Sequence, residues 1–548
     1  MSERRVRTRF APSPTGYLHL GGIRTALYNY LLAKKFNGDF ILRIEDTDQT
    51  RFVPEAQEYI LRALKWLNIE PNEGVGFTDN GFGPYIQSQR KDIYKEYAEL
   101  LVEKGAAYYA FDTDEELENM HKRLSAANVS NPQYNFVSRD FMKNSLTLPK
   151  EEVEERIKSG EKYVIRFKIF PNKTVRFYDI VRGWIKVDTS TLDDKVLLKS
   201  DGMATYHLAS IVDDHLMQIS HIIRGEEWLP SAPLHVLMYE AFKWERPEFI
   251  HLPLLLNPDG KGKLSKRDAD EGGFPIFPFS YYDNKTNKDV IGFKEKGFLP
   301  EAIINAVALL GWNPGNNKEL FTVEELIDSF SLEKLQKSGA RFNYKKFEWF
   351  NHQFIMKKSN EDILDILKEN IGTDNLNKYN STQLSEICEI TKERAFFKQD
   401  IYENIKYFFY SPNFSKITEN QKQLMDNGFN ENKINVAMHF ISNFLEDINT
   451  KPWDFKSLHD ILKLKLEKNN LTFKEIMPVF RLAIFGDING PDVIKSMIIL
   501  GKNETNKRFN TFKKKSILFL FKKINIISFL LIIFITFGFF LFFIFEIS

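Results

Sequence analysis

Cysteine is almost absent from this chain of 548 residues, in which Cys388 is the only one. A single thiol excludes a disulfide within the chain and cannot supply the cysteine ligands of a structural zinc site. The N-terminal stretch MSERRVRTRF has no apolar run behind its charges, so it lacks the pattern of a signal peptide. Together these features predict a protein of the reducing cytoplasm.

An excess of charge of one sign is also missing. The 75 Lys and Arg residues are balanced by 74 Asp and Glu residues, which gives a net charge of +1. Any RNA-binding surface must therefore arise from local segregation of charge rather than from a global basic field. Hydrophobic residues make up 43% of the chain and charged residues 27%, which is typical of a folded soluble protein. The length predicts roughly two to five domains.

One long uncharged run lies near the C-terminus, at residues 524–545. It is long enough to span a bilayer, and the lysines at 513–515 and 522–523 would keep the preceding domains on the cytoplasmic side. The alternative is that AT-rich DNA translated past a stop encodes this run of Phe, Ile and Leu without a selected role. Membrane contact is therefore one of two interpretations, and the run does not decide the function.

The first fifty residues predict a strand, a turn, a helix and a second strand. Arginines alternate with Val, Thr and Phe over residues 5–10, which is the period of a strand. The prolines and glycine of APSPTG (residues 11–16) end that strand, and apolar residues recur at helical spacing over 23–31. Residues 40–44 then form an apolar run broken only by an arginine. This order predicts a parallel crossover, the unit of a doubly wound sheet.

A second crossover is predicted from a strand at 195–198, a helix at 206–216 and a strand at 221–223. About a hundred residues of mixed helical and β-like pattern separate the two crossovers, so we expect an insertion that splits one nucleotide-binding fold. From residue 301 to about 515 the pattern is helical without a strand ladder. This part predicts an α-helical recognition region.

Three charged side chains are expected near the carboxyl ends of the predicted strands, where open parallel sheets bind ligands. They are Arg9, Glu45 and Arg224. Glu45 could bind the ammonium of an amino acid, and the two guanidinium groups could bind the carboxylate of an acidic side chain. Each could also be an ordinary ion pair at a strand end.

Two further segments suit phosphate groups. HLGG at residues 19–22 begins the first predicted helix, where free N–H groups and small residues favour an anion and His19 adds a donor. KLSKR at residues 263–267 follows the loop 257–262, and its cations suit the charge that builds on a departing pyrophosphate. The alternatives are a structural histidine and a solvated basic loop.

Taken together, these segments resemble the class I aminoacyl-tRNA synthetases, in the glutamyl form of bacteria. Residues 9–16 with 19–22 look like the HIGH motif, and residues 263–267 look like the KMSKS loop. Further segments that are similar to this family are RIEDTD (43–48), GPY (83–85) with Gln87, Ser88 and Arg90, YHLA (206–209), VDDH (212–215), RGEEW (224–228), LLGW (309–312), MP (477–478) with RLA (481–483), and GK (501–502). The likeness covers about residues 5 to 510 in the expected order.

The resemblance implies that glutamate attacks the α-phosphate of ATP, with Mg²⁺ spreading the phosphate charge, and that a tRNA ribose hydroxyl then accepts the glutamyl group. The implied glutamate contacts are Arg9, Ala11, Ser13, Glu45, Tyr206 and Arg224. The implied ATP contacts are His19, Gly21, Gly22, Glu226 and Lys266. The implied catalytic residues are His19, Lys263 and Lys266. In this family the first step usually waits for bound tRNA.

The implied fold class is α/β, a Rossmann-like doubly wound parallel sheet with an inserted α+β acceptor-binding domain, followed by an α-helical anticodon-binding region. The expected boundaries are 1–100 and 192–262 for the halves of the catalytic domain, 101–191 for the insertion, 263–350 for the stem-contact region, 351–510 for the anticodon-binding domain and 511–548 for the tail. The expected partners are tRNA-Glu, L-glutamate and ATP, and the expected state is a monomer.

Three departures from the family pattern stand out. Ser210 occupies a position where relatives often carry Asn, which puts one polar substrate contact in doubt. Many bacterial relatives hold zinc in the insertion, but the corresponding residues 108–111 read YYAF, so we expect no zinc. About twenty residues after Arg267, rich in Phe, Asn and Lys, lengthen the loop without an assignable function.

Three other functions compete. A glutamyl transferase that modifies a queuosine base shares the catalytic half but lacks anticodon-binding helices, so residues 351–510 argue against it. Glutaminyl-tRNA synthetase usually reads PPEPNG at residues 11–16 and has a β-barrel anticodon region. A catalytically silent, membrane-tethered RNA-binding protein would be favoured by loss of His19 or Lys266, and both are present. Charging of tRNA-Gln with glutamate is compatible with the sequence.

Overall fold

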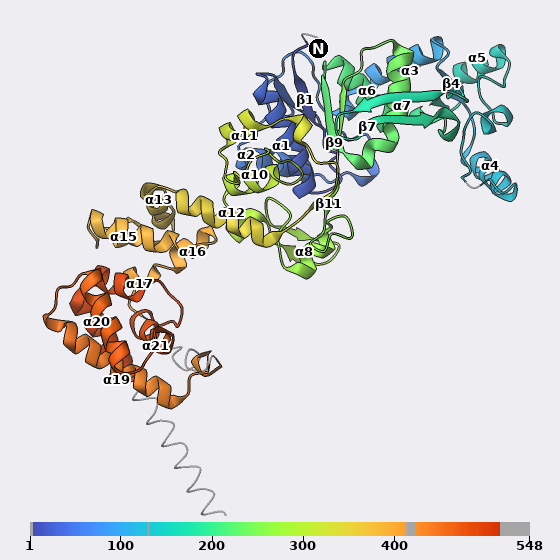
Figure 1. Ribbon diagram of the computed structural model, residues 1–548. Helices are drawn as coiled ribbons and strands as arrows, with labels where there is room; N and C mark the ends of the chain where they lie inside the picture. The colour runs from blue at the N-terminus through green and yellow to red at the C-terminus, as the bar shows by residue number, and fades with distance from the viewer. Residues whose placement is uncertain (1–3, 130, 413, 415–422, 427, 516–548) are drawn as a thin grey trace, which may run out of the picture. The chain divides into compact units, whose positions relative to one another are not determined.

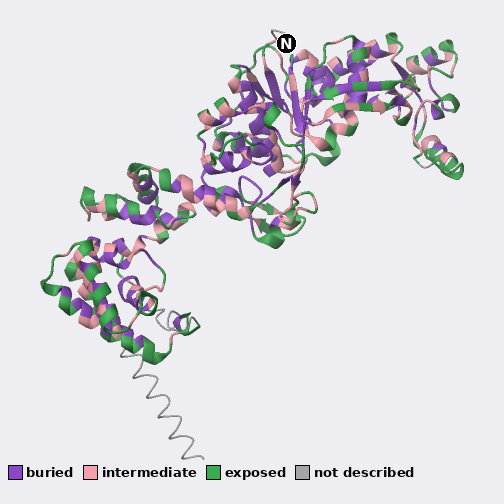
Figure 2. Ribbon diagram, in the orientation of Figure 1, coloured by how far each residue is buried: buried purple, intermediate pink, exposed green. Residues whose placement is uncertain are grey.

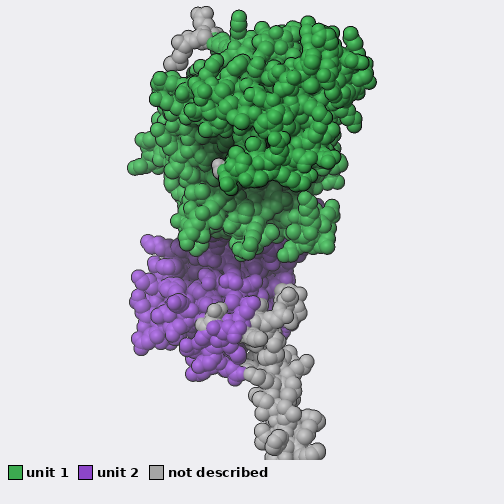
Figure 3. Space-filling view, turned by 90° about the vertical axis from the view of Figure 1, so that its right-hand side faces the viewer, with its two compact units in different colours: residues 1–351 green, residues 352–548 purple. Residues whose placement is uncertain are grey.

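The computed structural model describes residues 4–129, 131–412, 414, 423–426 and 428–515. The chain divides into two compact units, residues 1–351 and 352–548, which Figure 3 shows in different colours. The boundary falls within α12 (Tyr344–Lys357). Every strand among the described residues belongs to the first unit, and the second is built from helices.

The first predicted crossover is confirmed. β1 (Arg7–Phe10) and β2 (Asp39–Leu42) pair in parallel, α1 (Leu20–Lys35) connects them, and β3 (Glu73–Gly74) pairs with the other edge of β2. All four residues of β1 are buried, although alternation of polar and apolar residues ordinarily marks a strand with one wet face. The arginines of β1 therefore lie inside the protein and need ionic partners there.

The second predicted crossover is wrong by one element. Its first strand exists as β8 (Val196–Leu198), but β8 pairs antiparallel with β5 (Val164–Phe167) in a separate sheet. The second parallel crossover instead joins β9 (His221–Gly225) through α7 (Ala232–Phe242) to β10 (Glu248–Leu252). A short apolar run reveals a strand but not its pairing partner, which is why the sequence pattern misplaced it.

The two crossovers meet where β9 lies beside β1. The N–H of Ser220, which precedes β9, donates to the carbonyl oxygen of Arg7 at 2.9 Å. Asn29 on α1 donates from Nδ2 to the carbonyl oxygen of Ile223 on β9 at 3.2 Å. The sheet therefore winds outward in both directions from the β1–β9 junction, and the carboxyl ends of these strands mark the switch point at which doubly wound sheets bind ligands.

The predicted insertion contributes to the main sheet. β6 (Thr174–Asp179) and β7 (Gly183–Asp188) form a hairpin, and β6 pairs in parallel with β10. The strand order β7–β6–β10–β9 therefore includes two strands from within residues 101–191. The rest of that stretch includes β4 (Ala107–Ala110), and Figure 1 shows α5 beside that strand and α4 further out.

A small hydrophobic cluster forms around residues 108–111, the segment that corresponds to the zinc site of many bacterial relatives and for which we expect no zinc. It is formed by Tyr108, Ala110, Met120, Tyr134 and Met142. The described residues contain no group of three or more His, Cys, Asp or Glu side chains arranged to hold a metal ion. The absence of zinc stays a prediction, but the cluster gives this segment an apolar core of its own.

Buried Asp194 connects that cluster to its surroundings. Its carboxylate accepts hydrogen bonds from the hydroxyl of Tyr108 (2.7 Å), from Nη1 of Arg139 (3.1 Å) and from the N–H of Ile169 (3.0 Å). Three donors on one carboxylate fix the segments that carry them, because an unpaired buried charge is costly.

The other helices of the first unit are α2 (Ala56–Trp66), α3 (Lys91–Glu103), α4 (Asp114–Ala126), α5 (Lys150–Lys158), α6 (Tyr206–Leu216), α8 (Lys266–Gly272), α9 (Phe293–Lys296), α10 (Pro300–Ala308) and α11 (Val323–Ser329). Its remaining strands are β11 (Leu255–Leu256), β12 (Tyr281–Asp283), β13 (Lys288–Val290) and β14 (Ala340–Arg341). The strand β14 corrects the expectation of a purely helical pattern after residue 301, because it pairs in parallel with β11.

The second unit contains α13 (Asn360–Ile371), α14 (Thr373–Leu376), α15 (Ser381–Lys392), α16 (Lys398–Glu403), α17 (Lys406–Phe409), α19 (Glu431–Asp447), α20 (Phe455–Lys468) and α21 (Phe473–Phe485), and residues 493–515 are helical as well. Buried side chains such as Phe444, Leu462 and Phe480 form its core, which Figure 2 shows as purple on the inner helix faces. Within the described part of the chain, no helix has the length and apolar character needed to cross a bilayer. The uncharged run at 524–545 lies outside the described residues.

Asp194→Ala should loosen the segment around β4 and β5. The substitution removes the buried carboxylate partner of Arg139 and leaves only the exposed Asp140, 4.0 Å away. Loss of one partner at a buried pair costs about 3–5 kcal/mol. Hydrogen exchange should show faster opening of the β4 and β5 amides. Asp193→Ala, which removes the neighbouring, partly exposed carboxylate, is the matched control. Equal protection in both variants would show that Asp194 does not hold this segment.

Candidate active site

The start of α1 is shaped by HLGG. His19 caps the helix, and its Nδ1 accepts a hydrogen bond from the N–H of Gly21 at 3.0 Å. A Cβ at Gly21 would lie 2.9 Å from Cε1 of His19, and one at Gly22 would lie 2.4 Å from Cδ1 of Leu18. A larger residue at either position would therefore crowd the side chain of His19 or Leu18, so both glycines leave room for the turn that begins α1.

KLSKR begins α8, and Ser265 caps that helix by accepting a hydrogen bond from the N–H of Asp268. The side chains of Lys263 and Lys266 are exposed. The chain after α8 returns to α1, because the N–H of Leu20 donates to the carbonyl oxygen of Ile276 at 2.8 Å. The two predicted phosphate-binding segments, far apart in the sequence, are thereby tied together.

The charges of the second segment act on His19 in the first. Loss of hydration in the cleft lowers the pKa of His19, and the positive charges of Lys263 and Lys266 lower it further, while Glu227 opposes them. The ammonium of Lys263 lies 3.9 Å from the Glu227 carboxylate. A neutral imidazole beside two lysines forms a cationic mouth that suits an anionic ligand such as a polyphosphate.

The predicted Arg9 and Glu45 belong to one buried ionic chain. Arg9 donates from Nε and Nη2 to Asp214 at 2.9 and 3.3 Å, and Arg43 donates to the same carboxylate at 2.8 Å. Nη2 of Arg43 then donates to Oε1 of Glu45 at 2.9 Å. The order Arg9–Asp214–Arg43–Glu45 places alternating charges along the edge of the sheet. Nη1 of Arg9 and Oε2 of Glu45 lie outside these pairs.

Asp213 fixes this chain from behind. It accepts hydrogen bonds from Nε of Arg90 (2.7 Å), the hydroxyl of Tyr94 (2.8 Å) and Nε2 of Gln87 (2.9 Å). Asp213 and Asp214 stand next to each other on α6, and both are fully buried. Burial raises the pKa of Asp213, whereas for Asp214 the arginines outweigh burial and lower the pKa. α6 thus carries two acids that hold arginines from three other segments.

Arg224 is buried and is held by neutral partners. Its Nε donates to Nε2 of His251 at 3.0 Å, and its Nη1 donates to the hydroxyl of Tyr206 at 2.8 Å. The other nitrogen of His251, Nδ1, lies 2.7 Å from the carboxylate of Asp179 on β6. Because no carboxylate among the described residues pairs with Arg224 directly, its positive charge is available to an anionic ligand.

Tyr206 contacts Arg224 directly and lies within electrostatic reach of the other two predicted charges, Arg9 and Glu45. Burial raises the pKa of its hydroxyl, and the charges of Arg224, Glu45 and Arg9 all act on it. Its ring also packs on Trp228, with centroids 4.2 Å apart. Arg9, Glu45 and Arg224 are therefore gathered around one tyrosine at the carboxyl end of the sheet.

Ala11 and Ser13 follow the same edge. The N–H of Arg43 donates to the carbonyl oxygen of Phe10 at 3.0 Å, and the N–H of Glu45 donates to that of Pro12 at 3.0 Å. The segment that carries Ala11 and Ser13 therefore runs beside Glu45, and the side chain of Ser13 is exposed. The predicted ATP contact Glu226 is already engaged, by Arg182 and by the N–H of Leu254 at 2.8 Å.

The sequence-based prediction did not assign roles to Arg43, Asp213, Asp214 or the histidines around Arg224. The signal was present for Arg43, which interrupts the apolar run of β2, and for the two acids, which interrupt an apolar helix. A charge within a buried element needs a charged partner, and the partner cannot be identified until the elements are placed in space.

Comparison with known proteins agrees with this geometry. Residues 5–349 match the family model of tRNA synthetases class I (E and Q), catalytic domain, and residues 352–512 match the model of an anticodon binding domain. A glutamate–tRNA ligase of Amoebophilus asiaticus (strain 5a2) is 54% identical, with coverage of 93% of this chain and 98% of the relative. A glutamate–tRNA ligase of Cytophaga hutchinsonii is 49% identical, with coverage of 92% and 97%.

A solved structure is also similar. It is a glutamate tRNA ligase from Elizabethkingia meningosepticum CCUG26117 in complex with its amino acid, with 44% identity, a TM-score of 0.82, and coverage of 93% of this chain and 99% of that chain. Fold and site together define a class I aminoacyl-tRNA synthetase. Within that class, the chain belongs to the family of the E and Q tRNA synthetases. It is an enzyme that attaches an amino acid to tRNA, and ATP is its substrate.

Asp214→Ala should be among the most damaging single substitutions in the first unit. It leaves the guanidinium groups of Arg9 and Arg43 buried without their shared carboxylate, which costs about 3–5 kcal/mol of unfolding free energy. Chemical denaturation monitored by circular dichroism measures the change, with Asp201→Ala at an exposed acid as the control. A loss below about 1 kcal/mol would contradict the central place of Asp214.

Acid should lower the free energy of unfolding before the pH is low enough to protonate the carboxylates. Burial, helped by Lys195 and Arg224, lowers the pKa of His207 from 6.5 to about 4. The unfolded chain therefore binds the proton first, so the stability that neutral His207 contributes is complete above pH 6.5 and is lost as the pH falls toward 4. His207→Asn should flatten the fall in unfolding free energy across this window. His459→Asn, at a half-exposed position, should leave the fall in unfolding free energy unchanged. If His207→Asn also left it unchanged, His207 would not be the group responsible.

Proposed function

We infer that the amino acid is L-glutamate and that the chain ligates it to the 3′ end of tRNA-Glu through a glutamyl-adenylate. The observation that carries this inference is the gathering of Arg9, Glu45 and Arg224 around Tyr206 at the switch point of the sheet. A site for a doubly acidic metabolite needs one anionic and more than one cationic group, and this cluster supplies both. The named relatives are glutamate–tRNA ligases, which supports the same substrate.

In the proposed site, Glu45 binds the ammonium of glutamate and the two arginines bind its side-chain carboxylate, with Ala11, Ser13 and Tyr206 lining the pocket. Burial raises the pKa of Glu45, opposed by Arg43 and Arg9. A bound ammonium would favour the ionised form, so glutamate and Glu45 would stabilise each other.

For ATP, the proposed contacts are His19, Gly21, Gly22, Glu226 and Lys266, with Lys263 as a further cation. The α-carboxylate oxygen of glutamate attacks the α-phosphorus, a bond forms between them, and the bond to pyrophosphate breaks. Lys263 and Lys266 offset the charge that develops on the leaving group. The terminal ribose 2′-hydroxyl then attacks the glutamyl carbonyl carbon, and AMP leaves.

Mg²⁺ is proposed to accompany ATP. It neutralises phosphate charge when bound, and it is usually coordinated by phosphate oxygens and water with few protein ligands. The side chains at the mouth of the site are mainly cationic. They would not coordinate Mg²⁺ themselves, which leaves its coordination to phosphate oxygens and water. The protein's own contribution is to hold the triphosphate at the start of α1.

For tRNA, we propose that residues 101–191 hold the acceptor end, residues 263–350 contact the stem, and the helices of 351–510 bind the anticodon. The match of residues 352–512 to an anticodon binding domain supports the last assignment. We further propose that the enzyme works as a monomer in the cytoplasm, with tRNA-Glu, L-glutamate and ATP as its partners.

Charging of purified tRNA tests the proposal. The full-length chain should glutamylate tRNA-Glu, and Lys266→Ala should lower kcat/KM for ATP by about 10²–10³, since it removes a charge that acts on the leaving pyrophosphate. Lys261→Ala, at an exposed lysine of the preceding loop, should retain activity. Faster charging with glutamine than with glutamate, or no charging at all, would overturn the proposal.

A further inference from the structure

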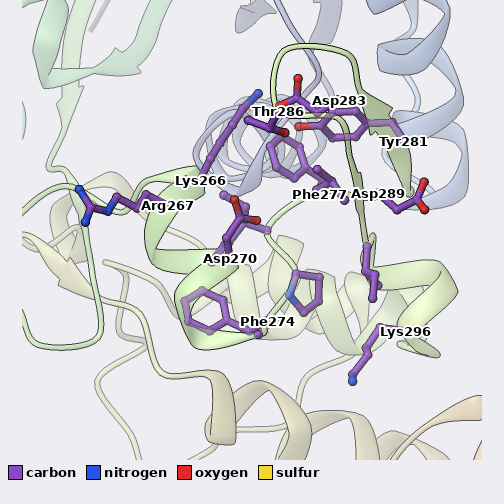
Figure 4. Close-up of a pocket in the computed structure, with 16 residues that line it drawn as sticks. Lys266, Arg267, Asp270, Phe274, Phe277, Tyr281, Asp283, Thr286, Asp289 and Lys296 are labelled. Carbon is purple, nitrogen blue, oxygen red and sulfur yellow. The ribbon is translucent and has the colours of Figure 1, made fainter.

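A hairpin directly after α8 has no role in the reaction as described so far. It consists of β12 and β13, with Tyr281 opposite Val290. Together with α8 it encloses a pocket of about 510 Å³ (Figure 4). The hairpin belongs to the stretch that lengthens the chain after KLSKR. Its residues and Lys266 line the same pocket.

Tyr281 contacts both phosphate-binding segments. Its ring packs on Tyr17, with centroids 4.2 Å apart, and Tyr17 stands two residues before His19. On its other side, Nζ of Lys266 lies 5.6 Å from the centroid of the Tyr281 ring. One side chain of the hairpin therefore bridges the segment that begins α1 and the segment that begins α8.

The ammonium of Lys266 is surrounded by groups that attract a cation. It lies 5.4 Å from the ring centroid of Phe277, in addition to its contact with Tyr281. Figure 4 shows Lys266 extending toward Asp283 and Thr286, and the charges of Lys266 and Asp283 act on each other. Aromatic faces attract cations within about 6 Å, so these contacts restrict where the ammonium can go.

The hairpin is anchored to a rigid part of the fold. The hydroxyl of Tyr59 on α2 donates to the carbonyl oxygen of Phe279 at 2.7 Å and accepts from the N–H of Phe279 at 3.0 Å. The Phe279 ring also packs on Tyr59 and on Trp66 of α2. β12 begins two residues later, so Tyr281 inherits its position from α2 rather than from a free loop.

The ring of Tyr281 matters more than its hydroxyl. The hydroxyl oxygen is buried and has no hydrogen-bond partner within the described part of the chain. Its neighbour Tyr282 is 53% exposed and makes no such bridge. The geometry therefore separates two adjacent tyrosines into one that faces Lys266 and one that faces solvent.

We propose that Tyr281 is a positioning residue that holds Lys266 toward the start of α1, where the triphosphate of ATP binds. The inference rests on the proposed function, because Lys266 needs a phosphate to act on. In the free enzyme a lysine side chain has many rotamers, and the ring restricts them before ATP arrives. Lys266 already lowers the pKa of His19, which is consistent with an ammonium held on that side of the cleft.

The kinetics of three variants test the proposal. With saturating glutamate and tRNA-Glu, Tyr281→Ala should lower kcat/KM for ATP by about two- to fivefold, the size of a cation–π contact at an exposed site. The KM for glutamate should stay within about twofold of wild type. Tyr281→Phe should restore the ATP kinetics because it keeps the ring, and Tyr282→Ala, the matched control, should not change them.

A double-mutant cycle identifies the route of the effect. If Tyr281 acts through Lys266, adding Tyr281→Ala to Lys266→Ala should cause no further loss in kcat/KM for ATP. Additive losses, unchanged ATP kinetics in Tyr281→Ala, or failure of Tyr281→Phe to restore them would each overturn the proposal. A wild-type chain that charges no tRNA would instead refute the function, so the two failures are distinguishable.

Discussion

The ionic chain Arg9–Asp214–Arg43–Glu45 is the constraint on which the rest of the site depends. All four side chains are buried, and a buried charge is tolerated only where it is paired. β1, β2 and α6 each contribute at least one member or lead directly into one, so none of these elements can shift without breaking a pair. The charges that are proposed to bind the substrate at the end of the sheet are therefore also those that fix its geometry.

The proposed phosphate-binding half of the site is organised differently, because its two lysines, Lys263 and Lys266, are exposed. His19, Lys263 and Lys266 are held by local caps, by aromatic contacts and by the hydrogen bond from Leu20 to Ile276. Such contacts cost less to break than buried ion pairs, which suits groups that must follow a changing phosphate. The proposed site thus combines a rigid end for the amino acid with an adjustable end for the nucleotide.

Local patterns in the sequence were sufficient to predict the first crossover, the turn at HLGG, and the opposite charges of Arg9 and Glu45 near the ends of their strands. They were insufficient wherever the answer depended on a partner distant in the chain. β8 has the composition of a strand, but only its pairing with β5 excludes it from the main sheet. Likewise Asp214 was visible as a buried acid in an apolar helix, but its pairing with two arginines follows from the packing of α6.

The most direct test of this account is a crystal structure of the chain with bound L-glutamate. The account predicts the ammonium of the ligand beside Glu45 and its side-chain carboxylate between Arg9 and Arg224. The pairs that Asp214 makes should remain unbroken. Glutamate bound away from this cluster, or bound with its carboxylate toward Glu45, would contradict the account.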